Sequence, residues 1–439
     1  MPIADPRELA LEVLLDVERG AWSDESLAIA LDASSLQGAD RGLATLLVYG
    51  TLAWQRTLDY TIDAFSSRPQ ERMHPAVRIA TRLGLYQLCV LDRIPAYAAL
   101  STSVDLVRAR SKGSASFVNA LLRRAQRQGL VAPPPSPIQT RLGIETSHPD
   151  WLVSMWRSEL GDTETEALLD ADNCAAPTTY RALGTQPMDA VIAALAARGI
   201  DAAKGRFGAR ALVIGGAAQP ASAEMVLQGE ASQLVVEMLA PRAGGSVLDA
   251  CAAPGGKTAY LAALAGAGAS VVATDPAPRA RERIQASLDA AGIADGVEIR
   301  LEDVRNFPAA AGGRQFDAIL VDAPCSGLGT LRQHPEIRWR RSPDDIEELA
   351  GRQRSILESA ASLLGRDGRL VYSTCTISRR ENDDVVDGFL AAHPDFRRDP
   401  ADALPSHVAA VCDAAGNLRT YPHSHGIDGF FAARLRRLA

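Results

Sequence analysis

The feature that most constrains this chain is a regular alternation of short apolar segments with amphipathic ones after Ser222. Buried strands separated by helices specify a doubly wound parallel sheet, because each crossover helix covers one face of the sheet. The sequence therefore predicts an α/β fold for the C-terminal half. The expected strands are residues 246–251, 270–275, 297–303, 316–325 and 368–375. One expected helix starts at Lys257, and two others span 279–290 and 344–364.

The preceding part of the chain has a different pattern. Over the first 130 residues apolar positions recur near the helical period, as at Leu9, Val13 and Val17, which predicts an all-α region. The tract PPPSP at 133–137 cannot continue a helix and is expected to be a linker. The next segment alternates strand, helix and strand, which predicts a small α+β unit over 178–214. We expect three domains, at 1–138, 139–224 and 225–439.

Composition bounds the class of protein. A chain of 439 residues favours two or three domains, and its 23% of charged residues is typical of a soluble globular protein. The first helix-like segment, 6–17, carries four charged side chains, unlike a signal peptide, and no apolar run reaches the length of a membrane span. We therefore expect a cytoplasmic protein that makes no membrane contact.

The six cysteines lie far apart in the sequence. No pair has the spacing of zinc ligands, so we expect free thiols, no disulfide and no metal site. Cys89 and Cys174 in particular are expected to be small buried hydrophobic residues.

Aspartates occupy equivalent positions near the ends of four of the expected strands. Asp249, Asp275, Asp303 and Asp322 each stand at or just before a strand end. Ligands of such sheets bind beyond the carboxyl ends of the strands. A single Asp there is ordinarily a turn or cap residue, but four at equivalent ends indicate a ligand site.

The segment after the first of these strands suits a closely bound ligand. Gly255 and Gly256 let the backbone approach it and present N–H groups at a helix start. A phosphate-binding P-loop would need glycine in place of Cys251, and the G-x-G-x-x-G order of a dinucleotide site is absent. Asp275, at the end of the next strand, is placed to accept both hydroxyls of a ribose. These features predict an adenosine ligand without a pyrophosphate.

The whole catalytic segment resembles the RNA cytosine-5 methyltransferases. The matching stretches are DACAAPGGKT (249–258), ATDPAPRARERI (273–284), LEDVR (301–305), VDAPCSGLGTLRQHPEIRW (321–339), RQRSIL (352–357) and YSTCTISRREN (372–382). The resemblance implies a Rossmann-like methyltransferase domain that uses S-adenosylmethionine. It also implies that Asp275 binds the ribose, Asp303 lies near the adenine, and Asp322 lies beside the methionine moiety and the target base. The other implied cofactor-binding residues are Cys251, Ala252, Ala253, Pro254, Gly255, Gly256 and Lys257.

Methylation of carbon 5 of cytosine explains why two cysteines are needed. A thiolate that adds to carbon 6 makes carbon 5 nucleophilic, and a second group handles the proton that leaves later. Cys325 and Cys375 end neighbouring expected strands, so both could face one pocket. Chemistry alone does not order them; the resemblance implies that Cys375 attacks and Cys325 assists elimination. Asp322 is expected to hydrogen-bond the cytosine, and two structural cysteines are the alternative.

Lys257 stands out because Lys occurs at only three positions among 46 Lys and Arg residues. A free thiol has a pKa near ~8.5, so a nucleophilic cysteine benefits from a nearby positive charge. We expect Lys257 to contact the base or the cofactor, and a solvent-facing helix-start residue is the alternative.

The N-terminal helices resemble the NusB RNA-binding fold, as fused in the RsmB (Fmu/Sun) type of ribosomal RNA methyltransferase. The matching stretches are ADRGLATLLVYGTLAW (39–54), VRIATRLGLYQLCVLDRIPAYAALSTSVDLVR (77–108) and SASFVNALLRRAQR (114–127). The resemblance implies that the substrate is bacterial small-subunit ribosomal RNA, free or partly assembled, and we expect a monomer. Ala53, Glu230 and Arg380 depart from the family pattern, the first in a region expected to meet RNA.

The net charge of −7 argues against a strongly basic nucleic-acid binder, but arginines cluster locally. Each of two groups could meet a phosphate backbone, with solvated helix faces as the alternative. The groups are Arg108, Arg110, Lys112, Arg123, Arg124 and Arg127, and Arg332, Arg338, Arg340 and Arg341 with Trp339.

Two other functions remain open. The same chemistry could act on transfer RNA or large-subunit ribosomal RNA. A non-catalytic RNA-binding assembly factor is the alternative from another class, although intact Cys325, Cys375, Asp322 and Lys257 count against it.

Overall fold

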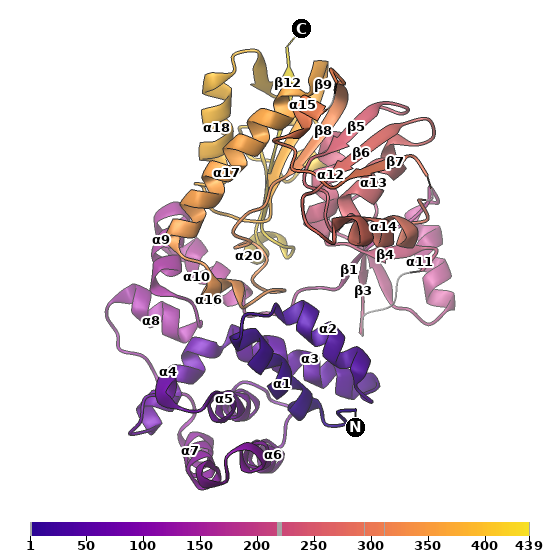
Figure 1. Ribbon diagram of the computed structural model, residues 1–439. Helices are drawn as coiled ribbons and strands as arrows, with labels where there is room; N and C mark the ends of the chain where they lie inside the picture. The colour runs from indigo at the N-terminus through magenta and orange to yellow at the C-terminus, as the bar shows by residue number, and fades with distance from the viewer. Residues whose placement is uncertain (1, 217–221, 294, 311, 439) are drawn as a thin grey trace. The chain divides into compact units, whose positions relative to one another are not determined.

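The computed structural model describes residues 2–216, 222–293, 295–310 and 312–438. They form two compact units (Figure 1). Unit 1 comprises Met1–Ala175 together with Leu331–Arg340, and unit 2 comprises Ala176–Thr330 together with Arg341–Ala439. The three-domain division at 138 and 224 stays a prediction. Within these described ranges, no helix has both the length and the apolar character that crossing a bilayer requires.

Unit 1 is all-helical, as its sequence periodicity predicts. Its first helix begins after Asp5, whose side chain accepts hydrogen bonds from two backbone N–H groups, and Pro6 fills the first helical position. Leu9, Leu47 and Leu83 are fully buried in its core. The helices are α1 (Pro6–Glu18), α2 (Ser23–Ala33), α3 (Gly38–Ala53), α4 (Gln55–Phe65), α5 (Pro75–Cys89), α6 (Ala96–Arg110), α7 (Ala115–Gln128), α8 (Ile138–Glu145), α9 (Asp150–Leu160), α10 (Asp162–Ala171) and α16 (Ile337–Arg340).

The segment Leu331–Arg340 is the unexpected member of unit 1. Arg338 is completely buried and donates hydrogen bonds to the carbonyl oxygens of Ala53, Ser147 and Asp172, at 3.3, 3.0 and 3.3 Å, and to Oδ1 of Asn173 at 3.0 Å. Burial lowers the pKa of this guanidinium to about 10. The expectation that this residue meets phosphate is therefore wrong, because backbone carbonyls occupy its donors.

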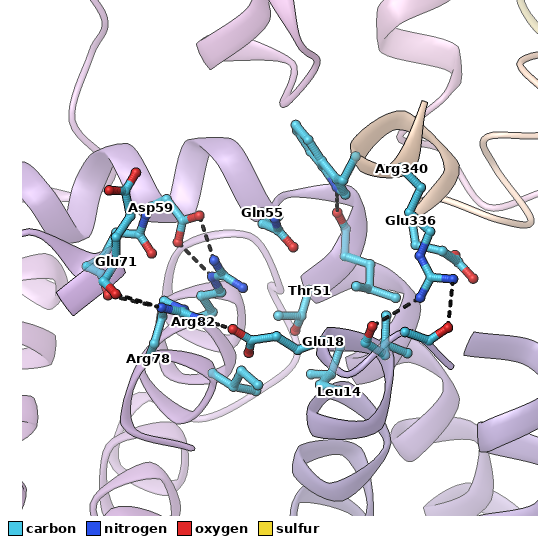
Figure 2. A pocket seen from close by; sticks show the side chains of 16 residues that line it. Leu14, Glu18, Thr51, Gln55, Asp59, Glu71, Arg78, Arg82, Glu336 and Arg340 are labelled. Atoms are coloured by element: carbon cyan, nitrogen blue, oxygen red, sulfur yellow. Dashed lines mark hydrogen bonds and ion pairs between the residues drawn. The ribbon is translucent and has the colours of Figure 1, made fainter. Parts of the chain in front are cut away.

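The two residues after Arg338 are also used inside unit 1. Trp339 donates its indole N–H to the carbonyl of Leu52 at 2.9 Å, and Arg340 donates to the carbonyls of Val17 and Ala21. Trp339 and Arg340 form part of the wall of a hollow of about 640 Å³ in unit 1. Figure 2 shows the side chains that line this hollow. Across the hollow, Arg82 binds Asp59 through two hydrogen bonds and Arg78 pairs with Glu18. Two ion pairs thus line the hollow.

Unit 2 begins with a small antiparallel sheet in the order β2-β3-β1-β4. The expected small α+β unit is confirmed, and two further strands belong to it. Its elements are β1 (Thr179–Ala182), α11 (Met188–Ala197), β2 (Ala202–Lys204), β3 (Ala211–Ile214) and β4 (Met225–Leu227).

The main sheet of unit 2 has the order β10-β12-β9-β8-β5-β6-β7, with β11 paired to β12. The strands β9, β8, β5, β6 and β7 run parallel, as predicted, whereas β12 runs antiparallel to its three partners β9, β10 and β11. The sheet is therefore mixed at this edge. The elements are α12 (Glu230–Leu239), β5 (Ser246–Asp249), α13 (Gly256–Ala265), β6 (Ser270–Thr274), α14 (Ala280–Ala290), β7 (Val297–Arg300), α15 (Phe307–Ala310), β8 (Phe316–Asp322), α17 (Pro343–Ser362), β9 (Leu364–Thr374), α18 (Asp383–Ala392), β10 (Phe396–Arg398), α19 (Ser406–Ala409), β11 (Leu418–Thr420), α20 (Pro422–His425) and β12 (Phe430–Arg437).

Helices cover both faces of this sheet, with α12, α13 and α14 on one side and α17 and α18 on the other (Figure 1). Successive side chains of a strand point to opposite faces, so Val247 packs with the α12–α13 side and Leu248 with the α17–α18 side. The strand order reverses between β5 and β8. Ligands of such folds bind at the carboxyl ends of the strands beside this switch point.

Candidate active site

The loop between β5 and α13 is shaped by a close helix approach. Gly255 has φ +107°, and a Cβ atom at this position would lie 2.7 Å from Cα of Ile284 in α14. Only glycine tolerates both conditions. The loop is also tied to the end of β6, because Asp275 accepts hydrogen bonds from the backbone N–H groups of Ala253 and Ala277 at 3.0 and 2.9 Å. A carboxylate has about four acceptor positions, so Asp275 retains acceptor capacity for hydroxyl groups.

Carboxylates surround the start of this loop. Burial raises the pKa of the Cys251 thiol well above its usual range, and the charges of Asp249, Asp322, Asp275 and Asp303 raise it further. The start of this loop thus has several carboxylates close by, two of which are paired with Lys257 and Arg305. It suits a ligand that carries positive charge and hydroxyl donors.

Two of these carboxylates differ in their surroundings. Asp249 is buried and accepts a hydrogen bond from the Thr258 hydroxyl at 2.7 Å, and burial raises its pKa to about 7. Asp303 lies beyond the end of β7, which stops at Arg300, three residues earlier than expected. Two hydrogen bonds from Arg305 lower the pKa of Asp303.

Lys257 and Asp322 form an ion pair. Their Nζ and Oδ2 atoms lie 2.7 Å apart, and the lysine side chain is only 17% exposed. Burial acts to lower the pKa of Lys257, but the charge and hydrogen bond of Asp322 outweigh it, so the pKa is raised. Ser373 donates a hydrogen bond to Oδ1 of Asp322 at 2.8 Å. The structure thus places a charged ammonium at the end of β8, and the solvent-facing alternative for Lys257 does not hold.

The two predicted cysteines lie together. Cys325 follows β8 and Cys375 follows β9, and these strands are parallel neighbours in which Asp322 pairs with Ser373. The two Sγ atoms are 3.3 Å apart. The hydrogen bond to Cys375 and burial raise the pKa of Cys325, so this thiol keeps its proton at rest.

The other described cysteines are free thiols, as expected. Cys174 is exposed, so its prediction as a buried residue is wrong, and Cys89 is only partly buried.

Sequence reasoning missed three residues that hold the loops carrying Cys325 and Cys375, namely Gln353, Glu381 and Asn382. Their signal was present in the motifs around 352–357 and 372–382, but polar residues near a strand end give no indication of their partners.

The first arginine group lies on α6 and α7 of unit 1. Arg108 and Arg123 line a groove of about 620 Å³ together with Tyr97, which is 76% exposed. Arg108 pairs with Asp105, and Arg124 lies over the ring of Phe65 at 4.4 Å. The side chain of Lys112 lies outside the described part of the structure, while Arg110 pairs with Glu8 and Glu12.

The strand order and the acidic residues at the strand ends define unit 2 as a Rossmann-like S-adenosylmethionine-dependent methyltransferase fold. A family model described as 16S rRNA methyltransferase RsmB/F matches residues 236–436. Models of the NusB family and of an RsmF/B-like ferredoxin-like domain match residues 4–127 and 148–220.

Two relatives are similar over their whole length. The probable ribosomal RNA small subunit methyltransferase B of Bacillus subtilis is 38% identical, with 98% of each chain covered. The ribosomal RNA small subunit methyltransferase B of Thermus thermophilus is 36% identical, with 100% of this chain and 99% of that protein covered. The crystal structure of PH0851 has a TM-score of 0.83 at 27% identity and covers 99% of both chains. The chain belongs to the RsmB/F methyltransferase family, which confirms the resemblance of its motifs.

Proposed function

We propose that this chain methylates carbon 5 of a cytosine in small-subunit ribosomal RNA, through a transient bond between Cys375 and carbon 6 of the ring. The observation that carries the proposal is the 3.3 Å separation of two thiols that follow the neighbouring strands β8 and β9, with Asp322, the ion-pair partner of Lys257, at the end of β8. A single nucleophile would not need a second thiol. Ring activation followed by elimination needs both a nucleophile and a group that handles a proton.

S-adenosylmethionine would supply an electrophilic methyl group. The residues present fit such a cofactor, because four carboxylates lie near enough to the thiol of Cys251 to raise its pKa, and this cofactor carries hydroxyl, ammonium and sulfonium groups that carboxylates attract. Asp275 has acceptor capacity for the ribose hydroxyls. The residues proposed to hold the cofactor are Cys251, Ala252, Ala253, Pro254, Gly255, Gly256, Lys257, Asp275, Asp303 and Asp322.

The roles of the catalytic residues follow from the order of bond changes. The thiolate of Cys375 adds to carbon 6, and negative charge develops toward N3 of the ring. The ammonium of Lys257, held 2.7 Å from Oδ2 of Asp322, can stabilise this charge by hydrogen bonding. After methylation the C5–H bond breaks and its electrons form the C5–C6 double bond, while the electrons of the S–C6 bond return to Cys375. Cys325 holds its proton at rest, so it can give this proton to the departing sulfur of Cys375 and take up the proton from carbon 5 in its place.

The substrate assignment rests on the relatives' names and on unit 1. The Bacillus subtilis and Thermus thermophilus relatives are both described as acting on the small ribosomal subunit RNA. The groove lined by Arg108, Arg123 and the exposed ring of Tyr97 offers charge for phosphates and a face for stacking. We propose free or partly assembled RNA as the substrate, because a base inside a finished subunit would be harder to reach.

Labelled S-adenosylmethionine tests the function directly. The purified chain is incubated with small-subunit RNA, large-subunit RNA or transfer RNA, and the digested nucleosides are identified by mass spectrometry. We expect 5-methylcytidine in small-subunit RNA alone, none with Cys375→Ser, and normal yield with Cys174→Ser, which changes an exposed cysteine. Label in another nucleoside, or full activity of Cys375→Ser, would overturn the proposal. Label in transfer RNA alone would replace the substrate and keep the chemistry.

A further inference from the structure

Cys325 is held through the residues on either side of it. The backbone N–H of Ser326 donates a hydrogen bond to Oε1 of Glu381 at 2.8 Å, and the Ser326 hydroxyl donates to Oε2. Gln353 donates from its amide to the carbonyl of Pro324 and to Oε1 of Glu381, both at 3.0 Å. Glu381 therefore binds the residue after Cys325 directly and the residue before it through Gln353.

Cys375 is held in the same manner by Asn382, the residue that follows Glu381 in the chain. Asn382 accepts a hydrogen bond from the Thr374 hydroxyl at 2.6 Å through Oδ1, and it donates from Nδ2 to the carbonyl of Thr376 at 2.9 Å. Thr374 and Thr376 flank Cys375. One side chain thus fixes the backbone on both sides of the second thiol.

Glu381 and Asn382 are themselves rigidly placed. Both are 0% exposed. The hydroxyl of Tyr372, in the buried C-terminal part of β9, donates to the carbonyl of Glu381 at 2.6 Å. Burial raises the pKa of Glu381, while its hydrogen bonds from Ser326 and Gln353 act in the opposite direction. A buried carboxylate is costly unless its hydrogen bonds are made, so any displacement of Ser326 would cost free energy.

We propose that Glu381 and Asn382 are a positioning pair that sets the separation of the two thiols, Glu381 by fixing the Cys325 loop and Asn382 by fixing the Cys375 loop. Because the two residues are adjacent in the chain, a single peptide bond links the two supports. The catalytic consequence rests on the proposed function, whereas the geometric claim does not.

The geometric claim is tested without RNA. Diamide oxidises two neighbouring thiols to a disulfide and is itself reduced to the hydrazine, so the rate of the Cys325–Cys375 linkage reports their proximity. The linked peptides are quantified by mass spectrometry in the full-length protein. Glu381→Gln loses an acceptor for the Ser326 hydroxyl, and Asn382→Asp cannot donate to Thr376. We expect each variant to slow the linkage at least about tenfold, since displacements of about 1 Å have large effects on reactions between neighbouring groups.

Glu347→Gln is the matched control. It removes a carboxylate that is 58% exposed and pairs with Arg380, the residue before Glu381, and we expect the wild-type rate. Thermal unfolding of all variants is measured alongside. Wild-type linkage rates in folded Glu381→Gln and Asn382→Asp would overturn the proposal.

The catalytic consequence gives opposite results for the two variants. Glu381→Gln displaces Cys325, so we expect slower elimination and a covalent RNA adduct that accumulates about tenfold above wild type. Asn382→Asp displaces Cys375, so we expect adduct formation to slow with an unchanged KM for RNA. A purely structural role would lower both steps together, and that result would overturn the proposal. If Cys325→Ala traps no adduct while the linkage rates still change, the proposed function fails and the positioning pair stands.

Discussion

Replacing Arg338 by methionine tests the most unexpected part of the fold, the use of segment 331–340 inside the helical unit. Methionine keeps much of the side-chain volume but removes a guanidinium that donates to three backbone carbonyls and to Asn173. Hydrogen bonds to a charged group contribute ~1.5–3 kcal/mol each, and a buried carbonyl left without a donor costs ~1–3 kcal/mol. Removing a buried charge offsets part of this loss. We expect a net destabilisation of unit 1 by about 3–5 kcal/mol.

The effect is local and can be measured locally. Hydrogen exchange followed by mass spectrometry should show reduced protection of α3 and α10 in Arg338→Met and unchanged protection of β5 and β8 in unit 2. In a unit of this size the change corresponds to a Tm that is lower by about 10 °C. Arg127→Ala, which changes an exposed arginine of α7, should leave the protection of unit 1 unchanged.

A destabilisation by Arg338→Met of less than about 1 kcal/mol would refute the reasoning. It would mean that the three carbonyls find other donors, and that segment 331–340 is not needed by the helical unit. Equal loss of protection in both units would refute the local assignment.

Three further predictions concern unit 2. The pKa of Asp249 rises from 3.8 to about 7 on folding, so the folded state favours its neutral form and loses stability as the pH rises from about 4 to about 7. Between these pH values the free energy of unfolding, measured by urea denaturation, should fall by about 4 kcal/mol from this group, and Asp249→Asn should remove that fall. The same dependence of the free energy of unfolding on pH in Asp249→Asn and wild type would contradict the assignment. Gly329→Ala would place a Cβ atom 1.9 Å from a backbone oxygen of Gly429 and should cost at least about 1–3 kcal/mol, whereas Gly388→Ala, in an open position of α18, should be neutral or stabilising by about 1 kcal/mol. Lys257→Met should slow single-turnover methylation by about 10²–10⁴-fold without unfolding the protein, and retention of the wild-type rate would remove Lys257 from the catalytic residues.

The sequence predicted the parts of the fold that depend on local patterns. Strands such as β5 and β8 are apolar runs with polar ends, and their aspartates lie at the strand ends because a parallel sheet brings its carboxyl ends to one edge. The meeting of Cys325 and Cys375 followed from the same reasoning, once their strands were taken as neighbours.

The sequence did not predict partners that are distant in the chain. Arg338 lies in a basic segment that fits phosphate contacts equally well, and only the folded chain brings it to the carbonyls of Ser147 and Asp172. The antiparallel direction of β12 depends on pairing with β9, which periodicity does not encode. Glu381 was likewise not identified, because a buried carboxylate and an exposed one look the same in a sequence.

The covalent bond between enzyme and RNA is the central claim, and trapping it is the most direct test. Cys325→Ala is mixed with small-subunit RNA and S-adenosylmethionine, denatured, digested with nuclease and protease, and the modified peptide is sequenced by mass spectrometry. The account predicts one nucleotide attached through the sulfur of Cys375, and no such species with Cys375→Ser. A nucleotide attached to any other residue, or efficient methylation that proceeds with no attached nucleotide in any variant, would contradict it.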